Sequence, residues 1–144
     1  YPPKGRYMWR DLARLATRYG LPFQVPSKFP RSGLLAARVA LLGTHEAWMG
    51  DFARAVMRAN FAEDRDIAEP KVIRSILEGL GLPADALLEA AGSEDNKRAL
   101  KRQTAKAGEV GLFGAPSFIT PDGEMFWGND RLPQLERWLE KGPF

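Results

Sequence analysis

Apolar residues recur every three or four positions from the start of the chain to about residue 110. This spacing places them on one face of a helix, and prolines and glycines mark where successive helices begin and end. We expect helices over about residues 5–19, 32–43, 44–59, 66–80, 83–92 and 93–108, with Ser32, Thr44 and Ser93 as N-caps. Three prolines within residues 21–30 remove backbone donors, so this segment is predicted to be an extended connector.

The pattern changes after residue 111. Two short runs rich in aromatic residues, 117–120 and 124–127, flank Pro121-Asp122-Gly123, which suits a tight turn. They predict a β-hairpin, followed by a final helix that turns Leu135 and Trp138 inward. An isolated two-stranded hairpin is marginal in water, so its strands need neighbours. Because the sequence opens at Tyr1 and not at a methionine, we expect those neighbours from sequence before Tyr1 rather than from another chain.

Composition restricts the class of protein. The 144 residues are 44% hydrophobic and 27% charged, as in a globular protein with one core. No run approaches the roughly 18 apolar residues of a membrane helix. The net charge of +3 is spread among acidic neighbours, so no basic stripe for nucleic acid is expected. There is no cysteine and one histidine, His45, which excludes a Cys-x-x-Cys pair or thiolate nucleophile in these residues and leads us to expect no metal.

Several short motifs, taken in order, resemble one family. They are Lys4-Gly-Arg-Tyr-Met with Asp11, Pro26 with Phe29-Pro30, Asp66-Ile67, Phe113-Gly-Ala-Pro and Phe126-Trp-Gly-Asn-Asp-Arg. Their order and spacing are similar to those of 2-hydroxychromene-2-carboxylate isomerases and kappa-class glutathione transferases, within the DsbA-like thioredoxin superfamily. The resemblance implies the α/β class and a thioredoxin-like fold with a large all-helical insertion, its N-terminal βαβ part apparently missing from this chain. It also implies a helical insertion domain over residues 6–108, a C-terminal strand-strand-helix half over 109–144, and a connecting loop over 1–5.

The resemblance implies that glutathione binds at five positions. Ala115, before a cis Pro116, would pair its backbone with the cysteinyl unit; the alternative is a trans proline at the start of an edge strand. Asp130 would pair with the γ-glutamyl ammonium, while Asn129 and helix N-terminal amides receive the carboxylate; both residues also suit ordinary helix capping. Lys4 would lie near the glycine carboxylate, or else in solvent as a loop lysine.

No catalytic residue is identified within the chain. In the family, a serine that faces the glutathione sulfur lies in an opening strand and loop, which here would fall upstream of Tyr1. Tyr7 and Asp11 match a family motif, but a packing and solubility pair on one helix explains them equally well. If an aromatic substrate is contacted, Trp9 or Phe29 is the preferred choice. The aromatic residues expected in the core are Trp9, Trp48, Phe52, Trp127 and Trp138.

The resemblance implies a glutathione-dependent cis-trans isomerase of the 2-hydroxychromene-2-carboxylate type, acting in the degradation of aromatic compounds. The glutathione thiolate would add to the conjugated double bond, allow rotation and leave. A kappa-class-like glutathione transferase is one alternative, and a DsbA-like thiol-disulfide oxidoreductase with its cysteines upstream is another. A helical nucleic-acid-binding module would need a clustered basic face. We further expect a cytoplasmic homodimer that acts on a small aromatic substrate and binds neither nucleic acid nor membranes.

Overall fold

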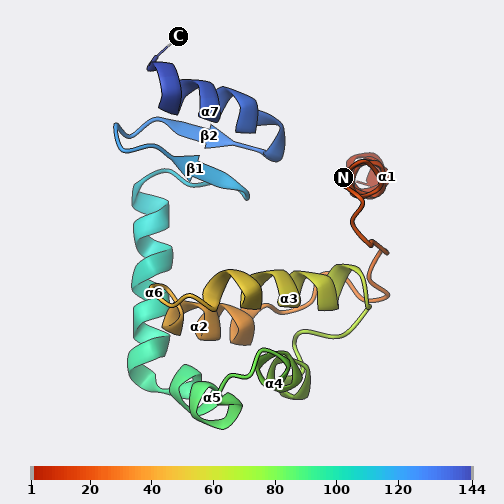
Figure 1. Cartoon of the computed structure of the whole chain (residues 1–144), viewed down its shortest axis with the longest axis vertical. Coiled ribbons are helices and arrows are strands. Elements are labelled where there is room, and N and C mark those ends of the chain that lie inside the picture. The colour runs from red at the N-terminus through yellow and green to blue at the C-terminus, as the bar shows by residue number, and fades with distance from the viewer. Residues whose placement is uncertain (1, 144) are drawn as a thin grey trace. The chain divides into compact units, whose positions relative to one another are not determined.

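The computed structural model describes residues 2–143, which are mostly helical (Figure 1). The elements, in chain order, are α1 (Pro2–Tyr19), α2 (Leu34–Leu42), α3 (Met49–Phe61), α4 (Pro70–Gly79), α5 (Ala84–Gly92), α6 (Glu94–Glu109), β1 (Ser117–Ile119), β2 (Met125–Trp127), the 3-10 turn η1 (Asn129–Arg131) and α7 (Leu132–Lys141). The chain forms two compact units that divide between Leu100 and Lys101, inside α6. No helix within residues 2–143 is both long and apolar enough to cross a membrane.

The hydrophobic core of the first unit lies among α2, α3, α4 and α5, which Figure 1 shows gathered into one group. Its largest fully buried side chains are Phe52, Ile73, Leu77 and Val39. Each belongs to an apolar face that the helical spacing of the sequence predicted. Trp48 packs edge-on against Phe52, with their ring centroids 6.0 Å apart, so both aromatic side chains belong to this core as expected.

Two helices begin later than the sequence predicted. Thr44 is not an N-cap, because its hydroxyl donates to the Leu41 carbonyl at 2.7 Å and so closes α2 instead of opening α3. The chain then makes turns up to Trp48, and α3 begins at Met49. The segment from Asp66 likewise turns before α4 begins at Pro70. In both places a short polar side chain bonds nearby backbone outside the helix.

Of the other two expected N-caps, Ser32 is wrong and Ser93 is confirmed. Gly33 and not Ser32 is the N-cap of α2, and the Ser32 hydroxyl accepts the Leu34 amide only at 3.5 Å. Ser93 does cap α6, because its hydroxyl accepts the Asn96 amide at 3.2 Å.

The segment after α1 is extended, as the prolines predicted. It carries Phe23 and Phe29 against Trp9 of α1, with ring centroids 6.4 Å and 4.8 Å from that of Trp9. The Phe29–Pro30 peptide bond is cis, which the sequence did not indicate. Trp9 is therefore partly buried, but Phe29 stays 53% exposed.

The second unit contains the predicted hairpin and final helix, which lie together in Figure 1. Its two strands pair antiparallel, with Phe118 opposite Phe126. Phe126 is buried and contacts Trp138 of α7, with ring centroids 5.8 Å apart. The Trp138 indole also donates to Asp122 Oδ2 at 3.0 Å, which ties the hairpin turn to α7. Trp127 points away from this packing and is 50% exposed, so the expectation that it belongs to the core is wrong.

Candidate functional site

The Ala115–Pro116 peptide bond is cis, as the resemblance implied. It lies in the loop before β1, and the Gly128 amide donates to the Pro116 carbonyl at 3.0 Å. That hydrogen bond extends the hairpin pairing and holds the loop against the turn that starts at Gly128. Ala115 is exposed, and among residues 2–143 no hydrogen bond engages its amide or its carbonyl. One backbone donor and one acceptor are thus open to a ligand beside Pro116.

Asn129 and Asp130 occupy η1, on the other side of that hydrogen bond. Neither side chain caps a helix, so the expectation of ordinary capping is wrong. Gly128 has φ +115°, and a Cβ on it would collide with Asp130 Oδ1. The Asp130 carboxylate therefore lies against the bare Gly128 backbone. It also pairs with Arg131, Oδ2 to Nη1 at 3.3 Å, and its side chain is 74% exposed.

Lys4 belongs to the other compact unit, where it is exposed in the first turn of α1, so the expectation of a connecting loop is wrong for residues 2–5. Its role at a glutathione carboxylate stays a prediction. Tyr7 and Asp11 meet on the surface of the same helix through Arg14. The Arg14 Nη2 lies 2.9 Å from Asp11 Oδ1, and its guanidinium carbon lies 5.5 Å from the centre of the Tyr7 ring. These contacts describe a surface group of side chains and assign no catalytic role to it.

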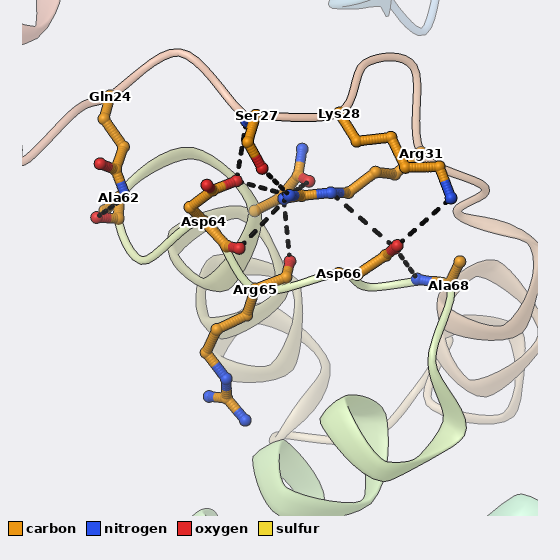
Figure 2. Close-up of polar contacts among 10 residues, drawn as sticks. Gln24, Ser27, Lys28, Arg31, Ala62, Asp64, Arg65, Asp66 and Ala68 are labelled. Atoms are coloured by element: carbon orange, nitrogen blue, oxygen red, sulfur yellow. Dashed lines mark hydrogen bonds and ion pairs between the residues drawn. The ribbon is translucent and has the colours of Figure 1, made fainter.

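The first unit also contains a polar cluster that sequence reasoning missed, which we call the Arg31 network (Figure 2). It joins the extended segment before α2 to the loop between α3 and α4. Only 3% of the Arg31 side chain is exposed. Its Nη2 lies 2.5 Å from Asp64 Oδ1 and also donates to Ser27 Oγ at 3.3 Å. Its Nη1 donates to Asn60 Oδ1 at 3.2 Å and to the Arg65 carbonyl at 3.1 Å.

Asp66 completes the Arg31 network. Its Oδ1 accepts the Ala68 amide at 3.0 Å and lies 3.8 Å from Arg31 Nε, a separation too long for a hydrogen bond. Its Oδ2 lies 3.5 Å from the Lys28 ammonium. Asp64, for its part, has φ +51°, a left-handed conformation that Asp tolerates better than most residues. The network fixes the loop between α3 and α4 against the extended segment before α2.

Both carboxyl groups of the network have lowered pKa values. The pKa of Asp64 lies below its ordinary 3.8, chiefly because the Ser27 amide donates to the carboxylate, with Arg31 adding to the effect. The pKa of Asp66 is lowered chiefly by the Ala68 amide, with partial burial opposing the shift and Lys28 and Arg31 reinforcing it. Both groups therefore favour the folded state most when they are ionised.

We expect this to appear as a loss of stability in acid. A carboxyl whose pKa is lowered by folding contributes stability that is fully present above its unfolded pKa and is lost as pH falls through its folded pKa. The urea midpoint of the wild type should therefore fall as the pH drops below about 4. In the double variant Asp64→Asn/Asp66→Asn the midpoint should be lower at pH 7 and change less with acid. Parallel curves for the two proteins would contradict this assignment of the acid-labile groups.

Sequence reasoning missed the Arg31 network because its residues lie far apart in the sequence. Asp66 was noticed only as part of a family motif, and Arg31 and Asp64 carried no signal of their own. They lie 33 positions apart, and neither sits at a helical or metal-ligand spacing. A basic residue directly after Phe29-Pro30 was the only available hint.

Comparison with known proteins places these features in a family. A DSBA-like thioredoxin domain matches residues 1–140. A 2-hydroxychromene-2-carboxylate isomerase of Sphingobium xenophagum is 33% identical over 95% of this chain and 69% of its own length. The kappa 2 glutathione S-transferase of Caenorhabditis elegans is 28% identical over 99% of this chain and 70% of its own length.

A solved structure of 2-hydroxychromene-2-carboxylate isomerase superposes with a TM-score of 0.84 at 28% identity, over 97% of this chain and 68% of that one. The resemblance and the thioredoxin-like fold class that the motifs implied are therefore both confirmed. The chain belongs to the DsbA-like thioredoxin family, in the group that contains the 2-hydroxychromene-2-carboxylate isomerases and the kappa-class glutathione transferases.

Proposed function

We propose that the protein is a glutathione-dependent cis-trans isomerase of the 2-hydroxychromene-2-carboxylate type. The observation that carries this proposal is the 3.0 Å hydrogen bond from the Gly128 amide to the Pro116 carbonyl. This hydrogen bond holds together the segment that carries the unpaired backbone of Ala115 and the turn that carries the exposed carboxylate of Asp130. Both lie in the second unit. The 33% identity to an isomerase supports this reaction in particular.

The groups at this site suit glutathione, an extended peptide with an ammonium and a carboxylate at its γ-glutamyl end. Ala115 offers one donor and one acceptor to the cysteinyl unit, as an exposed backbone does in strand-like peptide recognition. Asp130 offers a charged acceptor to the ammonium, and Asn129 offers an amide to the carboxylate. Lys4 is proposed to meet the glycine carboxylate.

Bound glutathione would supply a thiolate that adds reversibly to the conjugated double bond of the substrate and so permits rotation about it. The residues of this chain contribute by binding and orientation. Fixing both ends of the peptide reduces the motion that must be lost when the reacting atoms meet. In this proposal a serine outside the 144 residues stabilises the thiolate by a hydrogen bond.

A kappa-class glutathione transferase is the second candidate, favoured by the 28% identity to the C. elegans protein. The same residues would hold glutathione in either enzyme. The products differ, because the isomerase releases an isomer of its substrate and the transferase releases a stable thioether. A thiol-disulfide oxidoreductase would need cysteines that the 144 residues do not contain. We further propose a homodimer in the cytoplasm that takes a small aromatic acid from aromatic degradation.

The expected result for Asp130→Asn is a roughly 10-fold weaker affinity for glutathione, since a charge-assisted hydrogen bond to the ammonium is lost. Titration calorimetry of the intact protein measures this directly. Glu136→Gln, an exposed acid on α7, removes the same charge and should leave the affinity unchanged.

The reaction is tested with 2-hydroxychromene-2-carboxylate and glutathione, by absorbance for the isomer and mass spectrometry for a conjugate. Isomer without conjugate supports the isomerase, and accumulating thioether supports the transferase. If Asp130→Asn binds glutathione as tightly as the wild type does, the site assignment fails. If the wild type binds no glutathione at all, the proposed function fails with it.

A further inference from the structure

Two side chains of the hairpin contact the backbone of Gly114, in the loop before β1. The Ser117 hydroxyl donates to the Gly114 carbonyl at 2.6 Å. The Trp127 indole packs so closely on Gly114 that a Cβ added there would lie 2.5 Å from its Nε1. Ser117 and Trp127 stand opposite one another in the register of β1 and β2, so their side chains share one face of the hairpin. Gly114 is thus held by one side chain from each strand.

The hydrogen bond from Ser117 also sets the direction of the Ala115 amide. The Gly114 carbonyl and the Ala115 N–H belong to one peptide unit, which is trans and planar, so the two groups point in opposite directions. A hydrogen bond that fixes this carbonyl therefore fixes the N–H as well. On the other side of Ala115, the Gly128 amide donates to the Pro116 carbonyl at 3.0 Å. Ala115 lies between two carbonyl groups that the hairpin holds in place.

We propose that Ser117 is a positioning residue for glutathione, which acts through the Ala115 amide. The proposal rests on the proposed function, in which that amide donates to the cysteinyl unit. In this role Ser117 bonds to the loop and not to the peptide. A peptide unit without such a bond can rotate about its flanking backbone bonds, and ordering it would then cost entropy when glutathione binds. The bond from Ser117 removes this cost from the binding step.

The alternative is that the Ser117 hydroxyl only stabilises the loop, as serine side chains often do when they bond nearby backbone. Thr120 provides a comparison within the same hairpin. Its hydroxyl accepts the Glu124 amide at 3.1 Å and so stabilises the turn at the other end of β1. If both hydroxyls serve stability alone, the loss of either one should leave glutathione binding intact. If Ser117 positions Ala115, only its loss should weaken binding.

The test compares Ser117→Val with Ser117→Thr, whose new side chains have the same shape, suit a strand and differ by one hydroxyl. Titration calorimetry of the intact protein measures the affinity for glutathione. We expect it to fall roughly 5-fold in Ser117→Val and to stay within about twofold of the wild type in Ser117→Thr. Thr120→Val is the matched control, which should lower the urea midpoint and keep the affinity for glutathione.

NMR spectra of the intact protein without glutathione test the contact itself. The resonances of the Ala115 amide and the Gly114 carbonyl should shift in Ser117→Val and return close to their wild-type positions in Ser117→Thr. Unshifted resonances in Ser117→Val would overturn the proposal. So would a Ser117→Val variant that binds glutathione as tightly as the wild type, a Ser117→Thr variant that does not restore binding, or equal losses of affinity in Ser117→Val and Thr120→Val. These results would leave the proposed function standing, whereas a wild type that binds no glutathione would remove both.

Discussion

Replacing Arg31 with methionine is expected to lower the free energy of unfolding by about 2–3 kcal/mol, more than any other single change in the first unit outside its apolar core. Methionine fills a similar volume but donates no hydrogen bond. The substitution leaves Asp64 and Asp66 without their shared cation, and it leaves the carbonyl of Arg65 and the amide oxygen of Asn60 without a donor.

The expected loss is smaller than for a fully enclosed ion pair because water can reach the acids. The Asp64 side chain keeps 30% of its surface exposed and that of Asp66 keeps 26%. Arg31→Lys should lose less than Arg31→Met, since an ammonium keeps the charge but cannot reproduce the planar fork that reaches Asn60 and Asp64 together.

Urea denaturation measures the loss of stability in Arg31→Met. We expect a lowered midpoint with an unchanged slope. Arg54→Met is the matched control. Arg54 pairs with Asp51 on the surface of α3, where its side chain is 75% exposed, so its removal should change stability by less than about 0.5 kcal/mol. Equal losses in Arg31→Met and Arg54→Met would show that the Arg31 network adds nothing beyond an ordinary surface ion pair.

The local pattern of the sequence was sufficient for most elements of the fold. Helical spacing found the apolar faces that bury Phe52 and Leu77, and the turn at Asp122-Gly123 located both strands to within a residue. One error falls where a side chain had two possible partners. Thr44 could cap α3 or bond back to Leu41, and only the tertiary path of the chain selects the second.

The candidate site could be predicted only in part, for a related reason. Family motifs identified Ala115, Pro116 and Asp130, and the structure brings these together through Gly128. Exposure is a property of the assembled chain, so nothing in the sequence separates the exposed Trp127 from the packed Trp138. Sequence reasoning therefore assigned both to the core.

Gly128→Ala is expected to impair both stability and glutathione binding, through two separate causes. The backbone of Gly128, at φ +115° and ψ 148°, lies in a region that residues with a Cβ rarely adopt, at a cost of about 1–3 kcal/mol. The new methyl group would also occupy the position of Asp130 Oδ1, so the carboxylate must move away from its place against the Gly128 backbone. Glutathione affinity should then fall roughly 10-fold, as in Asp130→Asn.

Gly123→Ala separates the two causes. Gly123 has φ +89° in the hairpin turn, but a Cβ there meets no atom within 4 Å, so this variant should lose stability and keep its affinity for glutathione. In the double variant Gly128→Ala/Asp130→Asn the two losses of affinity should not add, because both act on one carboxylate. Calorimetry that found full affinity in Gly128→Ala, or additive losses in the double variant, would mean that Gly128 does not act through Asp130. The bare backbone at Gly128 would then serve the turn alone.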